Sequence, residues 1–291
     1  MSANYENLNE DQWLLRHAQN LFSQSGEDGI LEKIFETIPA ANRWCVEFGA
    51  WDGKTFSNTH QLMKSRGWHG VFVEAAADRF QDLVKTYGDN PNAHCVNCFV
   101  TFEGGNSLEN LLRRTAIPKD FDLLSIDIDG NDYHVWESLG HYEPRVVVIE
   151  FNPTIPSEVE FVQPRDMRVQ QGNSPLALVN LGKRKGYELI CMTGLNAIFV
   201  KTALFEAFHI ANNDISRLRP QAPHRFHLFQ LYDGTFVVAG SDMMPWHGIP
   251  IRQEKFQVLP KMFRVFPPES LNRWKRLLRR IWTFLYRRGW A

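Results

Sequence analysis

The sequence contains little cysteine and no long apolar run. Its four cysteines, Cys45, Cys95, Cys98 and Cys191, are scattered over 291 residues. They are too few for the disulfide framework of a small secreted protein and favour a reducing compartment. No stretch approaches the roughly 20 apolar residues of a membrane-spanning helix, and the polar start "MSANYENLNEDQ" lacks the apolar segment of a signal peptide. We therefore expect a cytoplasmic protein.

Net charge is also nearly absent, because 32 Lys and Arg balance 33 Asp and Glu to give −1. The positive and negative charges are unevenly distributed along the chain, however. Residues 271–291 hold no acid and carry +7, so the remaining residues carry −8. The seven cations are Arg273, Lys275, Arg276, Arg279, Arg280, Arg287 and Arg288.

Apolar residues recur at steps of three and four in the same tail, which predicts an amphipathic helix with a cationic face. They are Leu271, Trp274, Leu277, Leu278, Ile281 and Leu285. Such a helix can lie on an anionic membrane surface, which would place the protein at the inner face of the membrane. It can also dock on the body of the protein with its arginines in solvent. A nucleic-acid partner is disfavoured, since no second basic patch accompanies the tail.

Strand-like and helix-like segments alternate along most of the chain, which predicts an α/β fold with a doubly wound, mostly parallel sheet. The last two strands, near 187–202 and joined by a short connection at 194–196, predict an antiparallel hairpin at one edge of the sheet. We expect four parts: an N-terminal extension over 1–20, the sheet domain over 21–203, an irregular and partly β appendage over 204–268, and the basic tail over 269–291.

The first strand ends in "WCVEFGAWDGKTFSN", where acids and glycines follow an apolar run. Ligands of parallel sheets bind at the carboxyl ends of the strands. Gly49 and Gly53 permit tight backbone geometry, while Glu47 and Asp52 favour a cationic ligand over a phosphate. Glu74 ends the second strand, at a position where an acid typically binds ribose hydroxyls.

A positively charged adenosyl ligand held in this way is S-adenosylmethionine, and here the sequence resembles the class I methyltransferases over roughly residues 20–205. The segments "FSQSGEDGIL", "VEFGAWDGKTFSNT", "LLSIDIDGNDYHVW" and "VVVIEFNP" are similar to those of the FkbM-like group, whose members often O-methylate sugars and other hydroxylated products. The resemblance implies a Rossmann-like fold and S-adenosylmethionine as cofactor.

The resemblance also implies which residues bind that cofactor. Its methionine part would lie near Glu47, Gly49 and Asp52, its ribose near Glu74, and its adenine near Val100 and Ser107. Gln24 and Ser25 would close over the amino-acid end. The cofactor-binding set that we expect is Gln24, Ser25, Glu47, Gly49, Asp52, Gly53, Asn58, Glu74, Ala75, Val100, Ser107 and Asp127.

The ends of the fourth and fifth strands carry the candidate catalytic groups. An alcohol becomes a good nucleophile only when a base takes its proton or a metal ion polarises it. The candidate catalytic residues are Asp127, Asp129 and His134, with Asp129 or His134 as the base of a metal-free site. Asp127, Asp129, Glu150 and Asn152 are candidate ligands for Mg²⁺ or Mn²⁺, which prefer oxygen.

The sequence thus predicts an S-adenosylmethionine-dependent O-methyltransferase that acts on a hydroxyl of a sugar, glycan or glycan-linked intermediate. Two alternatives remain open at this point. One is a binding or scaffold protein that keeps the methyltransferase fold without turnover. The other is a methyltransferase for a small molecule that is not a sugar.

Overall fold

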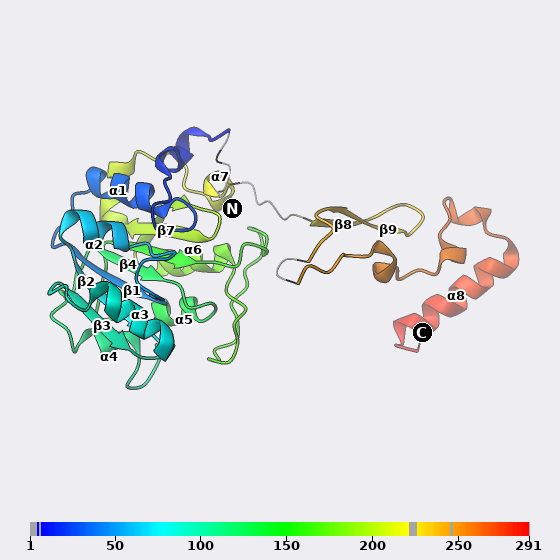
Figure 1. The fold of residues 1–291 in the computed structure, drawn as a ribbon. Helices are drawn as coiled ribbons and strands as arrows, with labels where there is room; N and C mark the ends of the chain where they lie inside the picture. Colours follow the sequence, from blue (N-terminus) through cyan, green and yellow to red (C-terminus); the bar gives the residue numbers. More distant parts are fainter. Residues whose placement is uncertain (1–4, 6, 221–225, 245–246, 291) are drawn as a thin grey trace. The chain divides into compact units, whose positions relative to one another are not determined.

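The computed structural model describes residues 5, 7–220, 226–244 and 247–290 (Figure 1). The chain forms two compact units, Met1–Gln221 and Ala222–Ala291. The larger unit contains the mixed sheet and its helices, and the smaller unit contains a β-hairpin and the basic tail helix.

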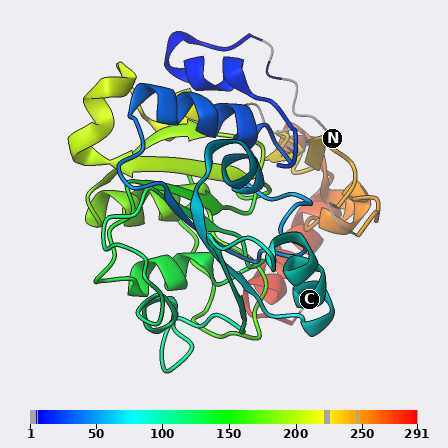
Figure 2. The ribbon, with the colours of Figure 1, turned by 60° about the vertical axis from the view of Figure 1, so that its left-hand side comes forward.

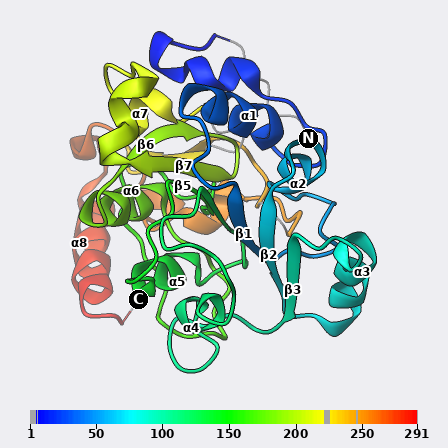
Figure 3. The ribbon, with the colours of Figure 1, turned by 90° about the vertical axis from the view of Figure 1, so that its left-hand side faces the viewer.

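A seven-stranded sheet forms the centre of the larger unit, with the strand order β3-β2-β1-β4-β5-β7-β6 (Figure 3). Strands β1 to β5 are parallel, whereas β7 is antiparallel to both of its neighbours, β5 and β6. This arrangement confirms the predicted sheet. The strands are β1 (Trp44–Phe48), β2 (His69–Glu74), β3 (Ala93–Asn97), β4 (Leu123–Ile126), β5 (Val146–Glu150), β6 (Tyr187–Met192) and β7 (Asn196–Lys201).

The helices of this unit begin where the sequence supplies capping groups. Ser174 accepts a hydrogen bond from the backbone of Ala177 and is followed by Pro175, a combination that favours the start of α6. Ser107 caps α4 in the same way. The α-helices are α1 (Glu27–Thr37), α2 (His60–Arg66), α3 (Ala77–Tyr87), α4 (Leu108–Leu112), α5 (Asp132–Ser138), α6 (Pro175–Arg184) and α7 (Ile215–Leu218), and two 3₁₀ helices are η1 (Glu10–His17) and η2 (Thr202–Phe208).

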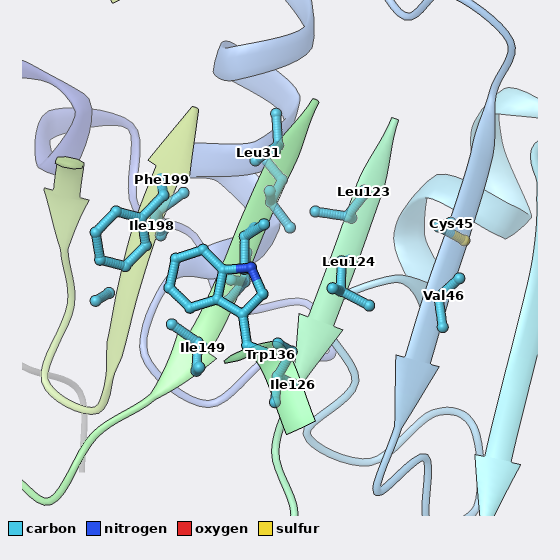
Figure 4. Packing of buried hydrophobic residues seen from close by; sticks show 14 of the residues in the cluster. Leu31, Cys45, Val46, Leu123, Leu124, Ile126, Trp136, Ile149, Ile198 and Phe199 are labelled. Carbon is cyan, nitrogen blue, oxygen red and sulfur yellow. The ribbon is translucent and has the colours of Figure 1, made fainter. Parts of the chain in front are cut away.

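The core lies between the sheet and the helices. β5 is apolar over Val146–Ile149 and fully buried there, as expected for a strand that is covered on both faces. The indole of Trp136, from α5, lies close to Ile126 and Ile149 (Figure 4), and its ring centroid is 5.2 Å from that of Phe199. These contacts hold the carboxyl ends of β4 and β5 against α5.

A buried acid holds the opposite end of β4. The carboxylate of Asp122 is fully buried and accepts hydrogen bonds from the backbone N–H groups of Ala41, Asn42 and Arg43 at 2.6–2.9 Å. It also pairs with the guanidinium of Arg145 at 2.7 Å. The segment that enters β1 is therefore tied to the start of β4.

The N-terminal segment belongs to the larger unit. η1 packs against α1, β6 and α7, and Figure 2 shows the dark blue start of the chain next to the blue helix α1. The boundary at residue 221 lies later than the predicted one at 203, because Phe208, Ile215 and Leu218 are buried in the same core as the sheet.

The smaller unit contains the predicted β structure and tail helix. A two-stranded antiparallel hairpin is formed by β8 (Phe226–Gln230) and β9 (Phe236–Gly240). Short 3₁₀ helices follow at η3 (Gln253–Phe256), η4 (Lys261–Phe263) and η5 (Pro268–Ser270), and the tail forms α8 (Arg273–Arg287). Among the helices in the described part of the chain, none combines the length and apolar character needed to cross a bilayer.

Candidate functional site

Acidic residues lie at the carboxyl ends of four adjacent strands of the sheet. Glu74 ends β2, Glu47 lies near the end of β1, Asp127 follows β4, and Glu150 ends β5. The parallel register places Phe48 beside Ile126, so Gly49 and Asp127 continue neighbouring strands. This edge is where the topology of a doubly wound sheet favours a ligand, and its negative charge favours a cationic one.

Gly49 makes the closest approach at this edge. Its φ is +76°, and a Cβ built on it would lie 1.7 Å from the carbonyl oxygen of Asp127. No side chain fits in that space. The loop after β1 therefore lies directly against the strand end that supplies Asp127, and only glycine allows this contact.

Glu47 is occupied by its own loop. Its carboxylate accepts hydrogen bonds from the hydroxyls of Ser57 and Thr59 at 2.6 and 2.7 Å and from the backbone N–H of Asn58 at 2.7 Å. Burial raises the pKa of Glu47, and these three donors oppose that shift. The Asn58 side chain in turn donates to Ser125 of β4 at 3.0 Å. Glu47 and Asn58 thus fix the conformation of the loop after β1, which forms one wall of the site.

Glu74 lies between two loops that would flank a ligand. One carboxylate oxygen accepts from the backbone N–H of Trp51 and the other from that of Ala76, both at 2.8 Å. The side chain is only partly buried. Each oxygen keeps a free acceptor position in this arrangement, so the carboxylate is oriented and able to bind a pair of hydroxyl groups.

Asp52 and Gly53 complete the turn after β1. The Asp52 carboxylate is partly buried, which opposes ionisation, but hydrogen bonds from Thr55 and Lys54 lower its pKa overall. Gly53 has φ +72°, and a Cβ there would meet the rings and methyls of Tyr87 and Leu83 at 2.6–2.7 Å. Asp52 is exposed enough to face a ligand in part, whereas Gly53 serves packing against α3.

Two aromatic residues of the same loop have unusual backbones. Trp51 and Phe56 have φ values of +49° and +58°, which bulky side chains rarely adopt, and their rings are 43% and 56% exposed. The guanidinium of Arg79 lies 4.5 Å from the Trp51 ring. Strained positions of this kind cluster at binding sites. Both rings offer flat apolar surfaces on the loop after β1, and the backbone of Trp51 contacts Glu74.

Asp127, Asp129 and Glu150 form a compact acid cluster. One oxygen from each carboxylate lies within 4.8 Å of the others. Burial, followed by the nearby acids, raises the pKa values of Asp127 and Glu150, which share a hydrogen bond. The pair therefore retains a proton at pH values where an isolated carboxyl is fully ionised.

The cluster also fits a divalent cation in its chemistry. Three carboxylates converge, and carboxylate oxygens are the ligands that Mg²⁺ and Mn²⁺ prefer. Asn152, the fourth predicted ligand, is committed elsewhere. Its side-chain oxygen accepts from the backbone and hydroxyl of Thr154 at 3.0 and 2.6 Å, and its amide donates to the carbonyl of Gln171. Asn152 thus stabilises a turn.

Asp129 and His134, the two predicted bases, differ in access. Asp129 is exposed, with φ +56°. His134 is buried and donates from Nε2 to the carbonyl of Gln163 at 3.0 Å, with Phe102 and Tyr133 against its ring. It is a packed residue rather than a member of the acid cluster. Asp132, also buried, accepts from the backbone of Ile128 and Gly130 and so shapes the loop that carries Asp127 and Asp129.

The long connection over residues 151–174 covers the turn after β4. Gln163 is buried and binds the backbone of Val169, Gln171 and Gly172, and Asn173 donates to the carbonyl of Gly130 at 2.9 Å. A Cβ on Gly130 would meet the carbonyl oxygen of Val169 at 2.9 Å. Gln163 and Asn173 were not among the predicted residues, because only the fold brings them to this turn.

The remaining predicted residues lie around the edge with different access. Val100 and Ser107 are buried and adjacent, because Thr101 and Ser107 form a β-bridge. Ala75 and Gln24 are exposed. Ser25 is buried, and its backbone N–H donates to Glu27 at 2.7 Å.

Two buried acids next to Ser25 were missed from the sequence. Glu27 binds Thr193 and Asn196, and one oxygen of Asp28 accepts from the backbone of 21–23 and from the Ser23 hydroxyl. The other oxygen of Asp28 is buried without a hydrogen-bond partner in the described residues. Two acids in the first turn of a helix, within "FSQSGEDGIL", were the available signal.

No family model and no curated protein matches the sequence. Among solved structures, the CurJ carbon methyltransferase is similar to 62% of this chain and 56% of that chain, with 9% identity and a TM-score of 0.41. The N-terminal domain of EvdMO1, solved with SAH bound, matches 62% of this chain and 82% of that chain at 12% identity and a TM-score of 0.40. An O-methyltransferase family protein from Burkholderia thailandensis matches 56% and 51%, at 10% identity and a TM-score of 0.39.

This chain thus spans little more than half the length of the CurJ and Burkholderia proteins. Scores and identities this low assign neither a family nor an activity, so the function follows from the residues at the sheet edge.

Proposed function

We propose that this protein is an S-adenosylmethionine-dependent methyltransferase. The observation that carries the proposal is the carboxyl edge of the sheet, where acids from β1, β2, β4 and β5 surround the close contact between Gly49 and Asp127. A sulfonium ligand is cationic, and an adenosyl group presents two ribose hydroxyls. Both features match a negatively charged edge with an oriented acid at the end of the second strand.

In this proposal each part of the cofactor has a partner. Glu74 accepts hydrogen bonds from the ribose hydroxyls, because its two oxygens are already aligned by Trp51 and Ala76. The methionine part lies along Gly49 and Asp52. Adenine lies toward Val100 and Ser107, and Gln24 borders the amino-acid end.

The acceptor in this proposal is a hydroxyl group. Its oxygen forms a bond to the methyl carbon as the carbon–sulfur bond breaks, and sulfur keeps the electron pair as a neutral thioether. Asp127 takes the hydroxyl proton. Among the candidate bases Asp127 is best suited, since burial and the neighbouring acids raise its pKa, and a base is most effective when its pKa is near the working pH.

We further propose that the acceptor hydroxyl belongs to a sugar, glycan or glycan-linked intermediate in the cytoplasm. The exposed rings of Trp51 and Phe56 support this choice, because flat aromatic faces pack well against sugar rings. A divalent cation, held by Asp127, Asp129 and Glu150, would polarise the hydroxyl. It would also lower the pKa values of Asp127 and Glu150. The metal and the free base are alternatives for the same cluster.

The test is calorimetric titration of S-adenosylmethionine and S-adenosylhomocysteine into the wild type and Glu74→Ala, each with Mg²⁺ and with EDTA. Losing hydrogen bonds to a charged acceptor should weaken cofactor binding by roughly 10- to 100-fold. Asp82→Ala, which removes a partly exposed acid of α3 that pairs with Lys85, is the matched control and should bind as the wild type does.

Absence of cofactor binding in the wild type would refute the proposal. Binding without methyl transfer to any hydroxylated acceptor, with Mg²⁺ present, would instead favour a binding protein that keeps this fold. If turnover occurs only with Mg²⁺, the acid cluster holds a metal. If EDTA leaves turnover unchanged, Asp127 acts as a free base.

A further inference from the structure

The tail helix α8 separates apolar and cationic side chains onto opposite faces. With a turn of about 100° per residue, Trp274, Leu278 and Ile281 fall on one side, together with Leu277, Phe284 and Leu285. Arg276, Thr283 and Arg287 fall on the other side, with Arg279 and Arg280. Asn272 fixes the start of the helix by accepting a hydrogen bond from the backbone of Lys275 at 2.9 Å.

Within the described part of the smaller unit, the apolar face of α8 is uncovered. No residue of α8 is buried, and Trp274 is 74% exposed, with Leu278 and Ile281 both close to half exposed. A helix with such a face normally packs it against other apolar groups. Among the residues of the smaller unit that the structure describes, none buries this face.

The charge of α8 selects among possible partners. The segment 271–291 holds seven cations and no acid, and the whole of 222–291 contains 12 Lys and Arg against four Asp and Glu. Four arginines of the polar face line an open concavity of about 670 Å³, together with Arg288 from the end of the helix; the four are Arg276, Arg279, Arg280 and Arg287. A partner that covers the apolar face therefore lies in a dense positive field, which favours a partner with negative charge.

The aromatic residues of α8 and of the segment directly after it also indicate the kind of partner. Trp282 and Tyr286 stack with ring centroids 4.8 Å apart, and the guanidinium of Arg288 lies 4.2 Å from the ring of Phe284 and 5.8 Å from that of Trp290. Trp and Tyr, with Arg beside them, are enriched at the boundary between lipid tails and headgroups.

We propose that α8 binds an anionic lipid bilayer, lying parallel to the surface. Its apolar face, centred on Leu278 and Ile281, enters the boundary between headgroups and acyl chains, and the flanking arginines bind the lipid phosphates. This proposal does not depend on the proposed methyl transfer, since it uses only residues of the smaller unit.

The experiment is co-sedimentation of the full chain with phosphatidylcholine vesicles, with and without phosphatidylserine, at low and high salt. The wild type should sediment with the anionic vesicles and lose most of this binding at high salt, because counterions screen the arginines. Leu278→Glu places an acid on the apolar face and should weaken binding at least about tenfold.

Thr283→Glu is the matched control, since it adds the same charge to the same helix on the polar face. It should weaken binding less than about fivefold, because its side chain lies away from the lipid. Far-UV circular dichroism of both variants on vesicles verifies that α8 still forms.

Three results would overturn the proposal. The wild type could fail to bind anionic vesicles, or the two Glu variants could bind equally well. The third is that Leu278→Glu, without lipid, lowers the melting temperature of the sheet domain or dissociates a dimer. In that case α8 covers its apolar face with this chain or with a second copy.

Discussion

Replacing Gly49 by Ala tests the contact on which the site is built. Two costs should add. The left-handed backbone, at φ +76°, disfavours any residue with a Cβ by about 1–2 kcal/mol. The new Cβ would also lie 1.7 Å from the Asp127 carbonyl oxygen, where ordinary contact begins at 3.4 Å. Relieving that overlap requires movement of two strand ends, at a cost of about 1–3 kcal/mol or more.

Gly186→Ala isolates the second cost. Gly186 has φ +80°, and a Cβ there would meet nothing within 4 Å. Both variants share the backbone penalty and the gain of about 0.4–1 kcal/mol from a stiffer unfolded chain. Gly49→Ala should therefore be less stable than Gly186→Ala by about 1–3 kcal/mol or more, which corresponds to a Tm lower by roughly 2–12 °C for a domain of this size.

Urea denaturation followed by circular dichroism measures the difference in stability, and calorimetry with S-adenosylhomocysteine measures its effect on the site. Gly49→Ala should bind the cofactor product more weakly than Gly186→Ala, because the displaced loop after β1 borders the methionine part of the cofactor in the proposed arrangement. Equal stability and equal binding of the two variants would show that the loop after β1 does not rest on the end of β4.

Three other substitutions test the proposed base, the contacts at the start of β4, and the connection over residues 151–174. Asp127→Asn should lower kcat by about 10²–10⁴ and leave S-adenosylhomocysteine binding intact; comparable loss of binding would contradict the base role. Since the pKa of Asp127 is raised, the base is protonated in mild acid, so wild-type kcat should rise with pH and level off only above the usual carboxyl range. A flat profile would argue against it. Asp122→Ala leaves Arg145 and three backbone N–H groups without their acceptor, and urea denaturation should show a loss of about 3–5 kcal/mol; a loss below about 1 kcal/mol is inconsistent with the buried clamp. Asn173→Ala frees the 151–174 connection from Gly130 and should raise the acceptor KM with cofactor affinity unchanged; an unchanged KM would place that connection away from the acceptor.

The sequence predicted the sheet and the acids at its edge because both depend on local pattern. Apolar runs such as Val146–Ile149 specify buried strands, and residues directly after such runs lie at a strand end whatever the rest of the chain does. Glu74 and Asp127 could be chosen on that basis alone.

The roles of individual side chains were harder to predict, because they depend on distant segments. Glu47 binds a loop ten residues later, and His134 is covered by the carbonyl of Gln163 from a different connection. The division of the chain after residue 221, later than the predicted boundary after residue 203, has a related cause. The sequence around Phe208 and Leu218 has no clear periodic pattern, yet the burial of these two side chains assigns it to the sheet domain.

The connection over 151–174 has a consequence for how this protein could change its choice of acceptor. Its inner residues, Gln163 and Asn173, hold it by bonds to backbone atoms, and those bonds do not require particular side chains on the receiving side. Its outer positions, such as Glu158, Glu160 and Arg168, are exposed. In the proposed methyltransferase, new residues there would change the surface of this connection and leave the acids at the sheet edge in place, so recognition of the acceptor would diversify separately from the chemistry.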